Sequence, residues 1–252
     1  MTDTIQYSQS DGIGRLTLNH PERHNSLGRE QLDALGACVE QVAQDTGVRV
    51  LIVTGAGDKT FCAGASLTEL GAGALADDAF QATMAKLAAL SVPTICALNG
   101  SVFGGGVELA ASCDFRVGVE GMRMRVPAAS LGLCYPLEGI RRFVECVGPR
   151  VARRILVAAE EFDTAGLVAI GFLDNVVERE ALEPTVTALA ERIAGLAPLA
   201  VQSMNEVLRQ MAAGELDGAR ADELVARCLH SRDLQEGLAA QREKRKPVFE
   251  GR

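Results

Sequence analysis

Three glycines and one glutamate between Asn99 and Asp114 have the types and spacing needed for acid–base chemistry. Gly104–Gly106 follow an apolar, strand-like run (Thr94–Leu98), and glycine at such a turn lets the backbone approach a ligand closely. A helix is expected from about Gly106, and its first amides can donate to a developing negative charge. Glu108 lies in that first turn among apolar residues, so we expect a raised pKa that suits proton transfer.

The same residues also fit a purely structural role, in which the glycines permit tight packing and Glu108 complements the helix dipole. A second turn makes the catalytic interpretation more specific. The segment from Phe61 to Leu70 places small residues after a predicted strand over 48–54, as the central stretch does. The glycines at 55 and 57 are not expected to form a dinucleotide loop, because position 60 is threonine and no helix follows directly.

Strands and helices alternate over the first 180 residues, which predicts an α/β core that must position these turns. Apolar periodicity predicts strands over 14–19, 48–54, 94–98, 115–119 and 173–177, and helices over 29–45, 80–90, 149–159 and 164–169. Another helix is expected to begin near Leu137, after an irregular segment from Met122 to Tyr135. From residue 182 onward the pattern is helical only. Because no Pro-, Ser- or charge-rich linker precedes this tail, we expect it to pack on the core or on a neighbouring subunit.

The charge of the chain argues against nucleic acid or an anionic membrane as its main partner. Its 252 residues carry a formal net charge of −8, and the pI is near 5.0. The sequence has no run of 18 apolar residues and begins with a polar segment, so neither a membrane span nor a secretory signal is expected. The seven cysteines form no CxxC pair, which favours reduced thiols in a cytoplasmic protein. The three histidines have no ligand spacing, so no metal site is expected.

Together, the two glycine turns resemble those of the crotonase (enoyl-CoA hydratase/isomerase) family. The matching motifs are Phe61-Cys62-Ala63-Gly64-Ala65, then Gly104-Gly105-Gly106-Val107-Glu108-Leu109, then Cys113-Asp114. The similarity continues through residues 19–27, 127–132, 147–149, 171–177 and 243–249, and so covers essentially the whole chain. On these residues the chain is identified as a member of that family.

The resemblance implies an α/β fold, a crotonase-like spiral of ββα units over residues 1–195. Residues 196–252 would form a helical C-terminal region that drives assembly into a homotrimer or homohexamer. Members of the family act on acyl-CoA thioesters and stabilise an enolate-like oxygen with two backbone amides, which match Ala65 and Gly105 here. Such donors contribute about 10²–10³ each in well-studied hydrolases. Coenzyme A enters as part of the substrate, and no separate cofactor is implied.

The resemblance also implies where the thioester binds. Lys246 and Phe249, from this or a neighbouring subunit, would meet the nucleotide end, although a solvated basic helix end explains Lys244–Lys246 at least as well. Phe80, Met84 and a mobile segment over 71–78 are expected to line the acyl end. The substrate-binding positions are Arg23, Leu27, Ala63, Gly64, Ser66, Leu67, Gly104, Pro127, Leu133, Lys246 and Phe249.

Departures from the family pattern bear on the chemistry. Hydratases of the family carry two glutamates; Glu108 matches the first, but the second position, after Pro127, is Ala128. Adding water to a double bond needs one group for the water and another for the α-proton, so the departure puts hydration in doubt. Glu138 is the nearest substitute, although a carboxylate at a helix start explains it as well. Ser66 also replaces the aspartate that is common after the first turn.

The segment from Leu131 to Phe143 is similar to the methylmalonyl-CoA decarboxylase branch, where a tyrosine stands at the position of Tyr135. Decarboxylation needs an oxyanion hole and an orienting group but no activated water. That branch tends to lack the glutamate matching Glu108, however, and amphipathic packing is the alternative role for Tyr135. We therefore expect a hydratase/isomerase-type enzyme, with a malonyl-type decarboxylase or a non-catalytic acyl-CoA-binding protein as alternatives. Glu108 is the expected acid/base, and Tyr135 and Glu138 are candidates for the second group.

Overall fold

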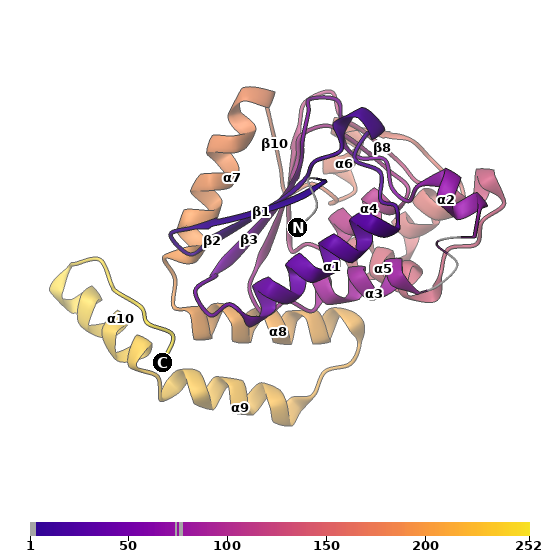
Figure 1. Cartoon of the computed structure of the whole chain (residues 1–252). Coiled ribbons are helices and arrows are strands. Elements are labelled where there is room, and N and C mark those ends of the chain that lie inside the picture. Colours follow the sequence, from indigo (N-terminus) through magenta and orange to yellow (C-terminus); the bar gives the residue numbers. More distant parts are fainter. Residues whose placement is uncertain (1–3, 74, 76–77) are drawn as a thin grey trace.

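A six-stranded sheet forms the centre of the computed structural model, which describes residues 4–73, 75 and 78–252. Its strands run in the order β1-β2-β3-β5-β7-β10 (Figure 1). β1 and β2 pair antiparallel, and the later neighbours pair parallel. Parallel neighbours need crossover connections, which here bring helices onto both faces. The bounds are β1 Ile5–Ser10, β2 Ile13–Leu18, β3 Val50–Gly55, β5 Thr94–Leu98, β7 Phe115–Val119 and β10 Asn175–Val177.

A second sheet of four short strands runs in the order β4-β6-β8-β9. Along the chain, β4 follows β3, β6 follows β5, and β8 follows β7, and helical structure comes after each pair. Each turn of the spiral therefore supplies one strand to each sheet and then a helix, which is the predicted ββα repeat. The bounds are β4 Thr60–Cys62, β6 Ser101–Phe103, β8 Arg123–Arg125 and β9 Phe162–Asp163.

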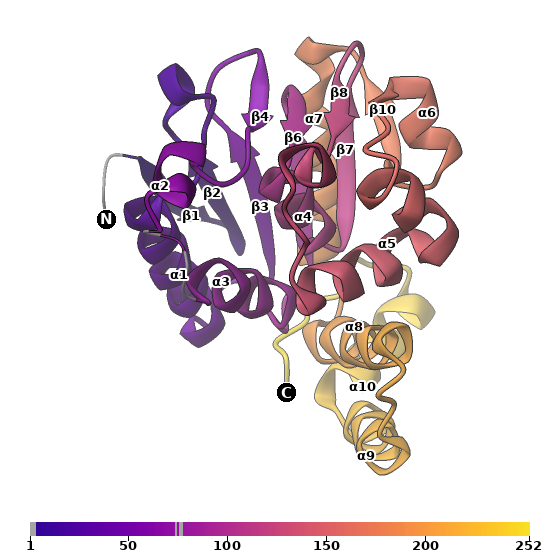
Figure 2. The same cartoon turned by 90° about the vertical axis from the view of Figure 1, so that its right-hand side faces the viewer.

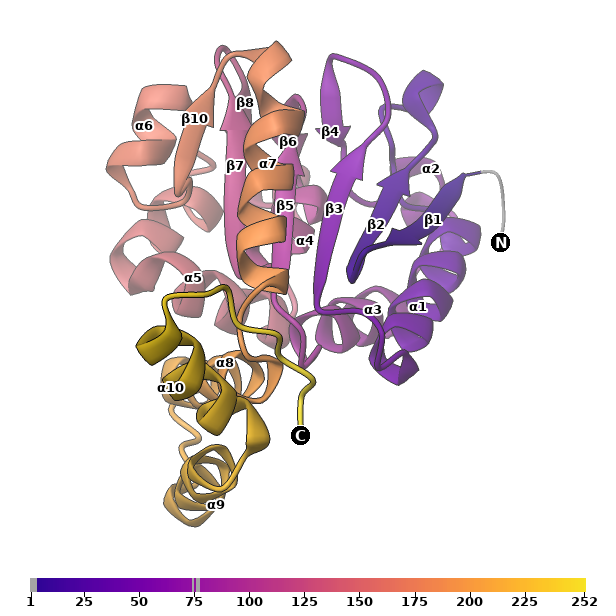
Figure 3. The ribbon, with the colours of Figure 1, turned by 90° about the vertical axis from the view of Figure 1, so that its left-hand side faces the viewer.

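Helices cover both faces of the six-stranded sheet. On one face, α7 (Arg179–Ala194) packs against β2, β3, β5 and β7 (Figure 3). On the other face lie four helices, seen in front of the sheet in Figure 2. They are α1 (Arg29–Gln44), α3 (Ala79–Ala88), α4 (Gly105–Ala111) and α5 (Leu137–Leu156). The same body contains α2 (Leu67–Gly71), α6 (Thr164–Ala169) and 3-10 turns at Pro21–Arg23 and Ala128–Leu131.

The C-terminal helices project from one end of this body (Figure 1). They are α8 (Pro198–Ala213), α9 (Gly218–Leu229) and α10 (Arg232–Glu243). Asn205 on α8 donates to the Asp114 carboxylate at 3.3 Å, and Arg49 donates to the Phe249 carbonyl at 2.7 Å. These bonds attach the helices and the final segment of the chain to the core. The boundary predicted between residues 195 and 196 falls in the turn between α7 and α8.

The sequence located the long buried elements well and the short strands poorly. The strands predicted over 94–98 and 115–119 match β5 and β7, and the helix predicted over 29–45 ends one residue beyond α1. The sequence-based prediction missed β1 because its residues are mostly polar and its outer face is exposed. It also missed β6 and β8, which have only three residues each and fall within segments interpreted as a glycine turn and as irregular. Such strands are too short to show a periodicity.

Candidate active site

The two glycine turns predicted to carry the site lie against each other. The first turn follows β4 and pairs with the N-terminal loop: Leu27 N donates to the Gly64 carbonyl at 2.8 Å, and Ser66 N donates to the Leu27 carbonyl at 2.9 Å. The second turn begins α4, and Gly104 N donates to the Arg125 carbonyl of β8 at 3.0 Å. These bonds fix the first turn to the N-terminal loop and the second turn to the four-stranded sheet.

Glycine is required where the two turns meet. Gly64 has a φ of +86°, and a Cβ built on it would lie 2.5 Å from the Gly105 nitrogen. Gly104 has a φ of +51° and a ψ of −126°, a conformation that residues with a side chain rarely adopt. A Cβ built on Gly106 would lie 2.6 Å from the Cys62 carbonyl oxygen. The three glycines therefore allow α4 to contact the first turn directly.

Two amides at this junction are available to a ligand. Within the part of the chain that the structure describes, neither Ala65 N nor Gly105 N donates a hydrogen bond. A Cβ built on Gly105 would lie 3.4 Å from the Ala65 nitrogen and 2.6 Å from Cζ of the Phe80 ring. Both N–H groups therefore belong to one small region bordered by Phe80 of α3. A pair of preorganised amide donors is the arrangement that stabilises an oxyanion.

A buried cluster of side chains surrounds Glu108 on α4. The carboxylate has no solvent exposure. Its Oε1 accepts a hydrogen bond from Arg142 Nη1 of α5 at 2.7 Å, and its Oε2 accepts from Gln81 Nε2 of α3 at 3.3 Å. The Tyr135 side chain, from the segment before α5, also interacts electrostatically with the carboxylate. Three segments that are distant in the sequence, α3, α4 and the stretch from Tyr135 into α5, therefore converge on one carboxyl group.

Packing holds Tyr135 against this cluster. Its ring meets the Phe143 ring edge-on, with centroids 5.5 Å apart and planes inclined by 81°. A Cβ built on Gly139 would lie 2.6 Å from Tyr135 Cδ1 and 3.1 Å from Glu108 Oε2. A side chain at position 139 would therefore push the tyrosine away from the carboxylate. This glycine gives α5 the close approach that the cluster requires.

The other end of the Gln81 amide is unsatisfied. Gln81 Oε1 is buried and has no hydrogen-bond partner among the described residues. Reversing the amide would set Oε1 against Glu108 Oε2, and both are acceptors, so the observed orientation is the consistent one. A buried acceptor without a donor costs about 1–3 kcal/mol. This oxygen is therefore positioned to accept from a donor that enters the site.

Burial and charge act in opposite directions on Glu108. Desolvation raises the pKa of Glu108, while Arg142 and the hydrogen bonds from Gln81 and Tyr135 lower it, and the net pKa lies above the usual value. Burial, followed by the Glu108 charge, raises the pKa of Tyr135 well above its usual range, so the hydroxyl stays protonated. A carboxyl group with a raised pKa, in the same first turn of α4 as the Gly105 amide, is suited to proton transfer.

Comparison with known protein families agrees with this geometry. A sequence profile of the enoyl-CoA hydratase/isomerase family matches residues 8–252. The chain belongs to this family. It is thus an acyl-CoA-transforming enzyme of the crotonase type, which confirms the expectation of an enzyme over a non-catalytic binding protein.

Several relatives of this family member match over nearly their full lengths. The chain is 32% identical to a crotonyl-CoA hydratase of Syntrophomonas wolfei, covering 98% of each chain. It is 34% identical to the 2,3-dehydroadipyl-CoA hydratase of Escherichia coli, covering 97% of this chain and 98% of the relative. An enoyl-CoA hydratase/carnithine racemase structure from Magnetospirillum magneticum superposes with a TM-score of 0.94 at 31% identity, covering 100% of this chain and 97% of that one. The predicted crotonase-like fold is confirmed.

The two candidates for the second catalytic group, Tyr135 and Glu138, lie in different surroundings. Tyr135 is in the cluster, whereas Glu138 is exposed and faces Arg141 at 3.8 Å. Ala128, at the position of the second family glutamate, is buried with 6% exposure. Among the described residues, Glu108 is the one carboxylate that belongs to this cluster.

The predicted substrate-binding residues fall into three groups. Those on the N-terminal loop and the first turn lie together: Arg23, Leu27, Ala63, Gly64, Ser66 and Leu67. Ser66 is also the N-cap of α2, where its hydroxyl accepts from Glu69 N at 3.4 Å. Gly104 begins the second turn, and Pro127 and Leu133 flank the 3-10 turn before α5, where Leu133 N donates to the Ala128 carbonyl. Lys246 and Phe249 lie in the C-terminal segment, at the opposite end of the molecule from α2 (Figure 1).

The expected acyl-end residues have different surroundings. Phe80 borders the two amides, as described above, whereas Met84 is fully buried in the core. The segment over 71–78, predicted to be mobile, includes residues 74, 76 and 77, which lie outside the described residues. Phe80 is therefore the described member of this group that reaches the site.

Two residues of the cluster, Arg142 and Gln81, were missed by sequence reasoning. A signal for Arg142 was present: α5 buries Gly139, Arg142 and Phe143, so an arginine occupies the apolar face of an amphipathic helix. A cation at such a position calls for a buried anion as its partner. Gln81 carried no comparable signal, because a glutamine near a helix start fits a solvent-exposed position equally well.

Three further features concern the chain as a whole. All seven cysteines are free thiols. Across residues 4–73, 75 and 78–252, no group of three or more His, Cys, Asp or Glu side chains is arranged to hold a metal ion. Over the same residues, no helix has both the length and the apolar character that crossing a membrane would require.

Proposed function

We propose that this enzyme moves protons on the acyl group of a CoA thioester through an enolate, using Glu108 as its single catalytic carboxylate. The observation that carries the proposal is the pairing of a buried, hydrogen-bonded Glu108 with two unpartnered amides, while position 128 is alanine. The relatives described above are named as hydratases of CoA thioesters, which supports the substrate class.

In the proposed reaction, the thioester oxygen accepts hydrogen bonds from Ala65 N and Gly105 N. Glu108 removes a proton from the carbon next to the carbonyl, and the electron pair of that C–H bond moves into the carbonyl to form the enolate. With a 3-enoyl thioester, the enolate extends over the double bond. Glu108 then returns the proton to the far carbon, and the double bond moves into conjugation. One base that gives back the proton it took completes this cycle.

Hydration needs a second acid/base group, and the cluster around Glu108 contains no second carboxylate among the described residues. Water must be activated while the α-carbon is protonated, and these tasks call for two groups. Tyr135 has a raised pKa and stays protonated, and Glu138 is exposed beside Arg141. Loss of an acid/base partner costs about 10²–10⁴-fold. We therefore propose double-bond isomerisation ahead of hydration as the natural reaction.

A substrate panel tests this proposal. Crotonyl-CoA, a 3-enoyl-CoA and methylmalonyl-CoA are each incubated with the enzyme, and products are identified by mass spectrometry. We expect hydration of crotonyl-CoA to be at least about a hundredfold slower than the fastest of the other reactions. Brisk hydration that survives Tyr135→Phe and Glu138→Gln would contradict the two-group argument.

Decarboxylation of a malonyl-type thioester is the second candidate, and the place of Tyr135 inside the cluster favours it. In this reaction the bond to the carboxylate breaks, carbon dioxide leaves, and its electron pair forms the same enolate, which Glu108 then protonates. No water is activated. Release of carbon dioxide from methylmalonyl-CoA, with no isomerisation of the 3-enoyl-CoA, would select this candidate.

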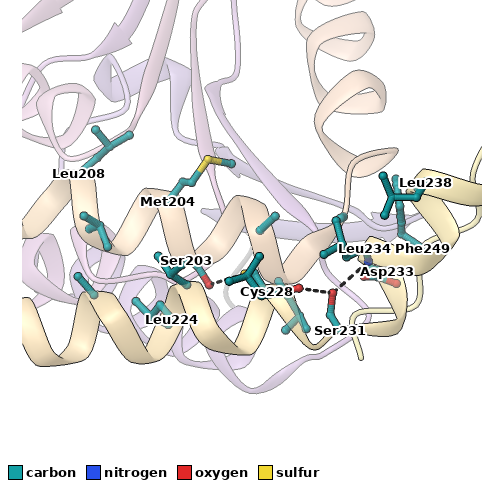
Figure 4. A pocket seen from close by; sticks show the side chains of 18 residues that line it. Ser203, Met204, Leu208, Leu224, Cys228, Ser231, Asp233, Leu234, Leu238 and Phe249 are labelled. Carbon is teal, nitrogen blue, oxygen red and sulfur yellow. Dashed lines mark hydrogen bonds between the residues drawn. The ribbon is translucent and has the colours of Figure 1, made fainter. Parts of the chain in front are cut away.

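We also propose assembly into a homotrimer or homohexamer in the cytoplasm. The supporting observation is an apolar groove of about 680 Å³ between α8, α9 and α10 (Figure 4), lined mainly by leucine, valine, methionine and alanine. Several large side chains on these helices are exposed, including Met204, Leu208 and Leu238, and exposed apolar surface of this extent marks an interaction site. The free cysteines are in keeping with a reducing compartment. Light scattering that finds a stable monomer at micromolar concentration would contradict the assembly.

A further inference from the structure

Arg142 of α5 is a buried cation whose partner is the buried carboxylate of Glu108. Its side chain retains 9% of its exposure, and the Glu108 partner retains none. Taking both charges out of water is costly, and removing one partner of such a pair leaves an uncompensated charge. Its neighbour on α5, Arg141, has an exposed side chain and pairs with Glu138 and Glu215. Of these two adjacent arginines, Arg142 is the one turned into the protein, where it pairs with Glu108.

The two carboxylate oxygens of Glu108 have different hydrogen-bond partners. Arg142 Nη1 holds Oε1 at 2.7 Å, the shorter of the two measured contacts, whereas Gln81 Nε2 approaches Oε2 at 3.3 Å. Gln81 also presents its unpartnered Oε1 beside Oε2. The side of the carboxylate toward α5 is therefore occupied by a charged hydrogen bond. The side toward α3 carries the weaker contact, with Gln81. The preceding residue of α3, Phe80, borders the oxyanion amides.

We propose that Arg142 is a positioning residue of the active site, which fixes Oε1 of Glu108, directs Oε2 toward the acyl group and keeps the buried carboxylate ionised. This role deepens the proposed function and rests on Glu108 being the acid/base. Substrate does not touch Arg142, which acts through the carboxylate. The chain thereby retains a base at neutral pH at a buried position.

The other groups facing the carboxylate do not supply this charge. From α3 the neighbour is the neutral Gln81, and from the segment before α5 it is Tyr135, whose pKa is raised. The Cys62 thiol of β4 is nearby, and burial raises its pKa to about 12, so it remains neutral. Glu145, farther along α5, is an anion that interacts with Arg142 and adds no positive charge. Among the described groups around Glu108, Arg142 is the cation.

The test is the pH profile of kcat/KM for Arg142→Gln, measured on whichever thioester the wild type turns over. Glutamine can still donate to Glu108 but carries no charge. An opposite charge at this distance lowers a carboxyl pKa by about 1–3 units. We therefore expect the acid limb of the profile to move up by about 1–3 pH units. Arg141→Gln is the matched control on the adjacent, exposed arginine, and its profile should coincide with that of the wild type.

Two further variants keep the test decisive. Arg142→Lys restores a charge but not the fixed fork of the guanidinium; its acid limb should lie within about one unit of the wild type while kcat falls. This variant decides the matter if Arg142→Gln does not fold. In a Glu108→Gln background, Arg142→Gln should cause no further loss of activity. An unshifted limb in folded Arg142→Gln, or unchanged kcat in Arg142→Lys, would overturn the proposal.

Failure of this inference is distinguishable from failure of the proposed function. If Glu108→Gln retains full activity, the carboxylate is not the acid/base and the proposed function falls. If Glu108→Gln is inactive while the Arg142 variants keep the wild-type profile, the function stands and only the role of Arg142 is lost.

Discussion

The two halves of the active site are built by different means. The oxyanion half consists of the Ala65 and Gly105 amides, which are positioned by glycine conformations and by backbone hydrogen bonds between neighbouring strands. The acid/base half consists of side chains on α3, α4, α5 and the segment before α5, held by one buried ion pair and by a hydrogen bond from Gln81. The first half depends on backbone geometry, and the second depends on the packing of separate helices.

This difference determines how each half responds to change. A backbone donor survives any substitution that keeps φ, ψ and the N–H, so its environment can vary widely around it. A buried carboxylate depends on every group that faces it, because its charge is sensitive to burial and to its partners. The acid/base half is therefore the part in which family members can change reaction type without rebuilding the oxyanion hole.

Removing the acid/base group should give the largest effect. Glu108→Gln keeps an acceptor for Arg142 but cannot exchange a proton at working pH, so kcat should fall about 10²–10⁴-fold. Steady-state kinetics on the best thioester of the panel measures this loss. Glu138→Gln, on the exposed carboxylate of α5, should retain the wild-type rate. Equal losses of kcat in both variants would show that Glu108 is not the specific acid/base group.

Removing one donor from the backbone half should come next. Gly105→Pro deletes an amide at the first helical position, where proline is tolerated, and should lower kcat about 10²–10³-fold with little change in CoA affinity. Gly105→Ala is the matched control, since its Cβ meets the Phe80 ring in the same way but the N–H remains. Circular dichroism checks that both variants are folded. Similar rates for the two would remove Gly105 from the oxyanion hole.

Adding a carboxylate should move the acid/base half toward hydration. Ala128→Glu supplies the group that hydratases of the family carry, and crotonyl-CoA hydration should rise at least about tenfold. Ala128→Gln has the same size without the ionisable group and should give no rise. Because position 128 is buried, thermal melts accompany the assay. A rise in both variants would mean that shape, not proton transfer, limits hydration.

The pH profile should distinguish the halves, because only one of them titrates. Glu108 acts as a base when ionised, and its pKa is raised by burial, so kcat/KM should fall below a pH higher than the usual glutamate value. The fall should be about tenfold per pH unit. Residual activity in Glu108→Gln, which relies on the backbone donors, should lack this limb. The same limb in that variant would assign the titration to another group.

Removing the tyrosine hydroxyl should have the smallest effect of the five. Tyr135→Phe deletes a hydrogen-bond donor that interacts with the carboxylate but keeps the edge-on contact with Phe143. A hydrogen bond of this kind is worth about 0.5–1.5 kcal/mol, which corresponds to a rate loss of about 2–13-fold. A loss above about a hundredfold would show that Tyr135 takes part in the chemistry itself.

The backbone half could be predicted from the sequence because its requirements are local. The glycines at 64 and 104–106 have conformations or close contacts that other residues do not allow. The sequence motif therefore predicts the backbone geometry of the two turns. The surroundings of Glu108 could not be predicted in the same way. Arg142 and Gln81 are 34 and 27 positions away from it, and only the packing of α5 and α3 against α4 brings them to the carboxylate.

The fold shows the same division between local and long-range information. The buried run Val50–Val53 and the helix over 29–44 were recognisable because their patterns extend over several residues. The four-stranded sheet was not, because β6 and β8 are short and acquire their strand geometry by pairing with each other and with β4 and β9. That sheet is nevertheless what fixes the second glycine turn, through the bond from Gly104 N to Arg125.

The unpartnered Gln81 Oε1 has a consequence for inhibitor design. A CoA thioester analogue with a hydroxyl or amino group placed to reach this oxygen would satisfy an acceptor that the protein itself leaves without a donor. Relieving such a deficit is worth about 1–3 kcal/mol, or roughly 5–150-fold in binding affinity. An analogue with a methyl group at the same position would lack this gain, so the ratio of the two inhibition constants reports directly on the orientation of the Gln81 amide.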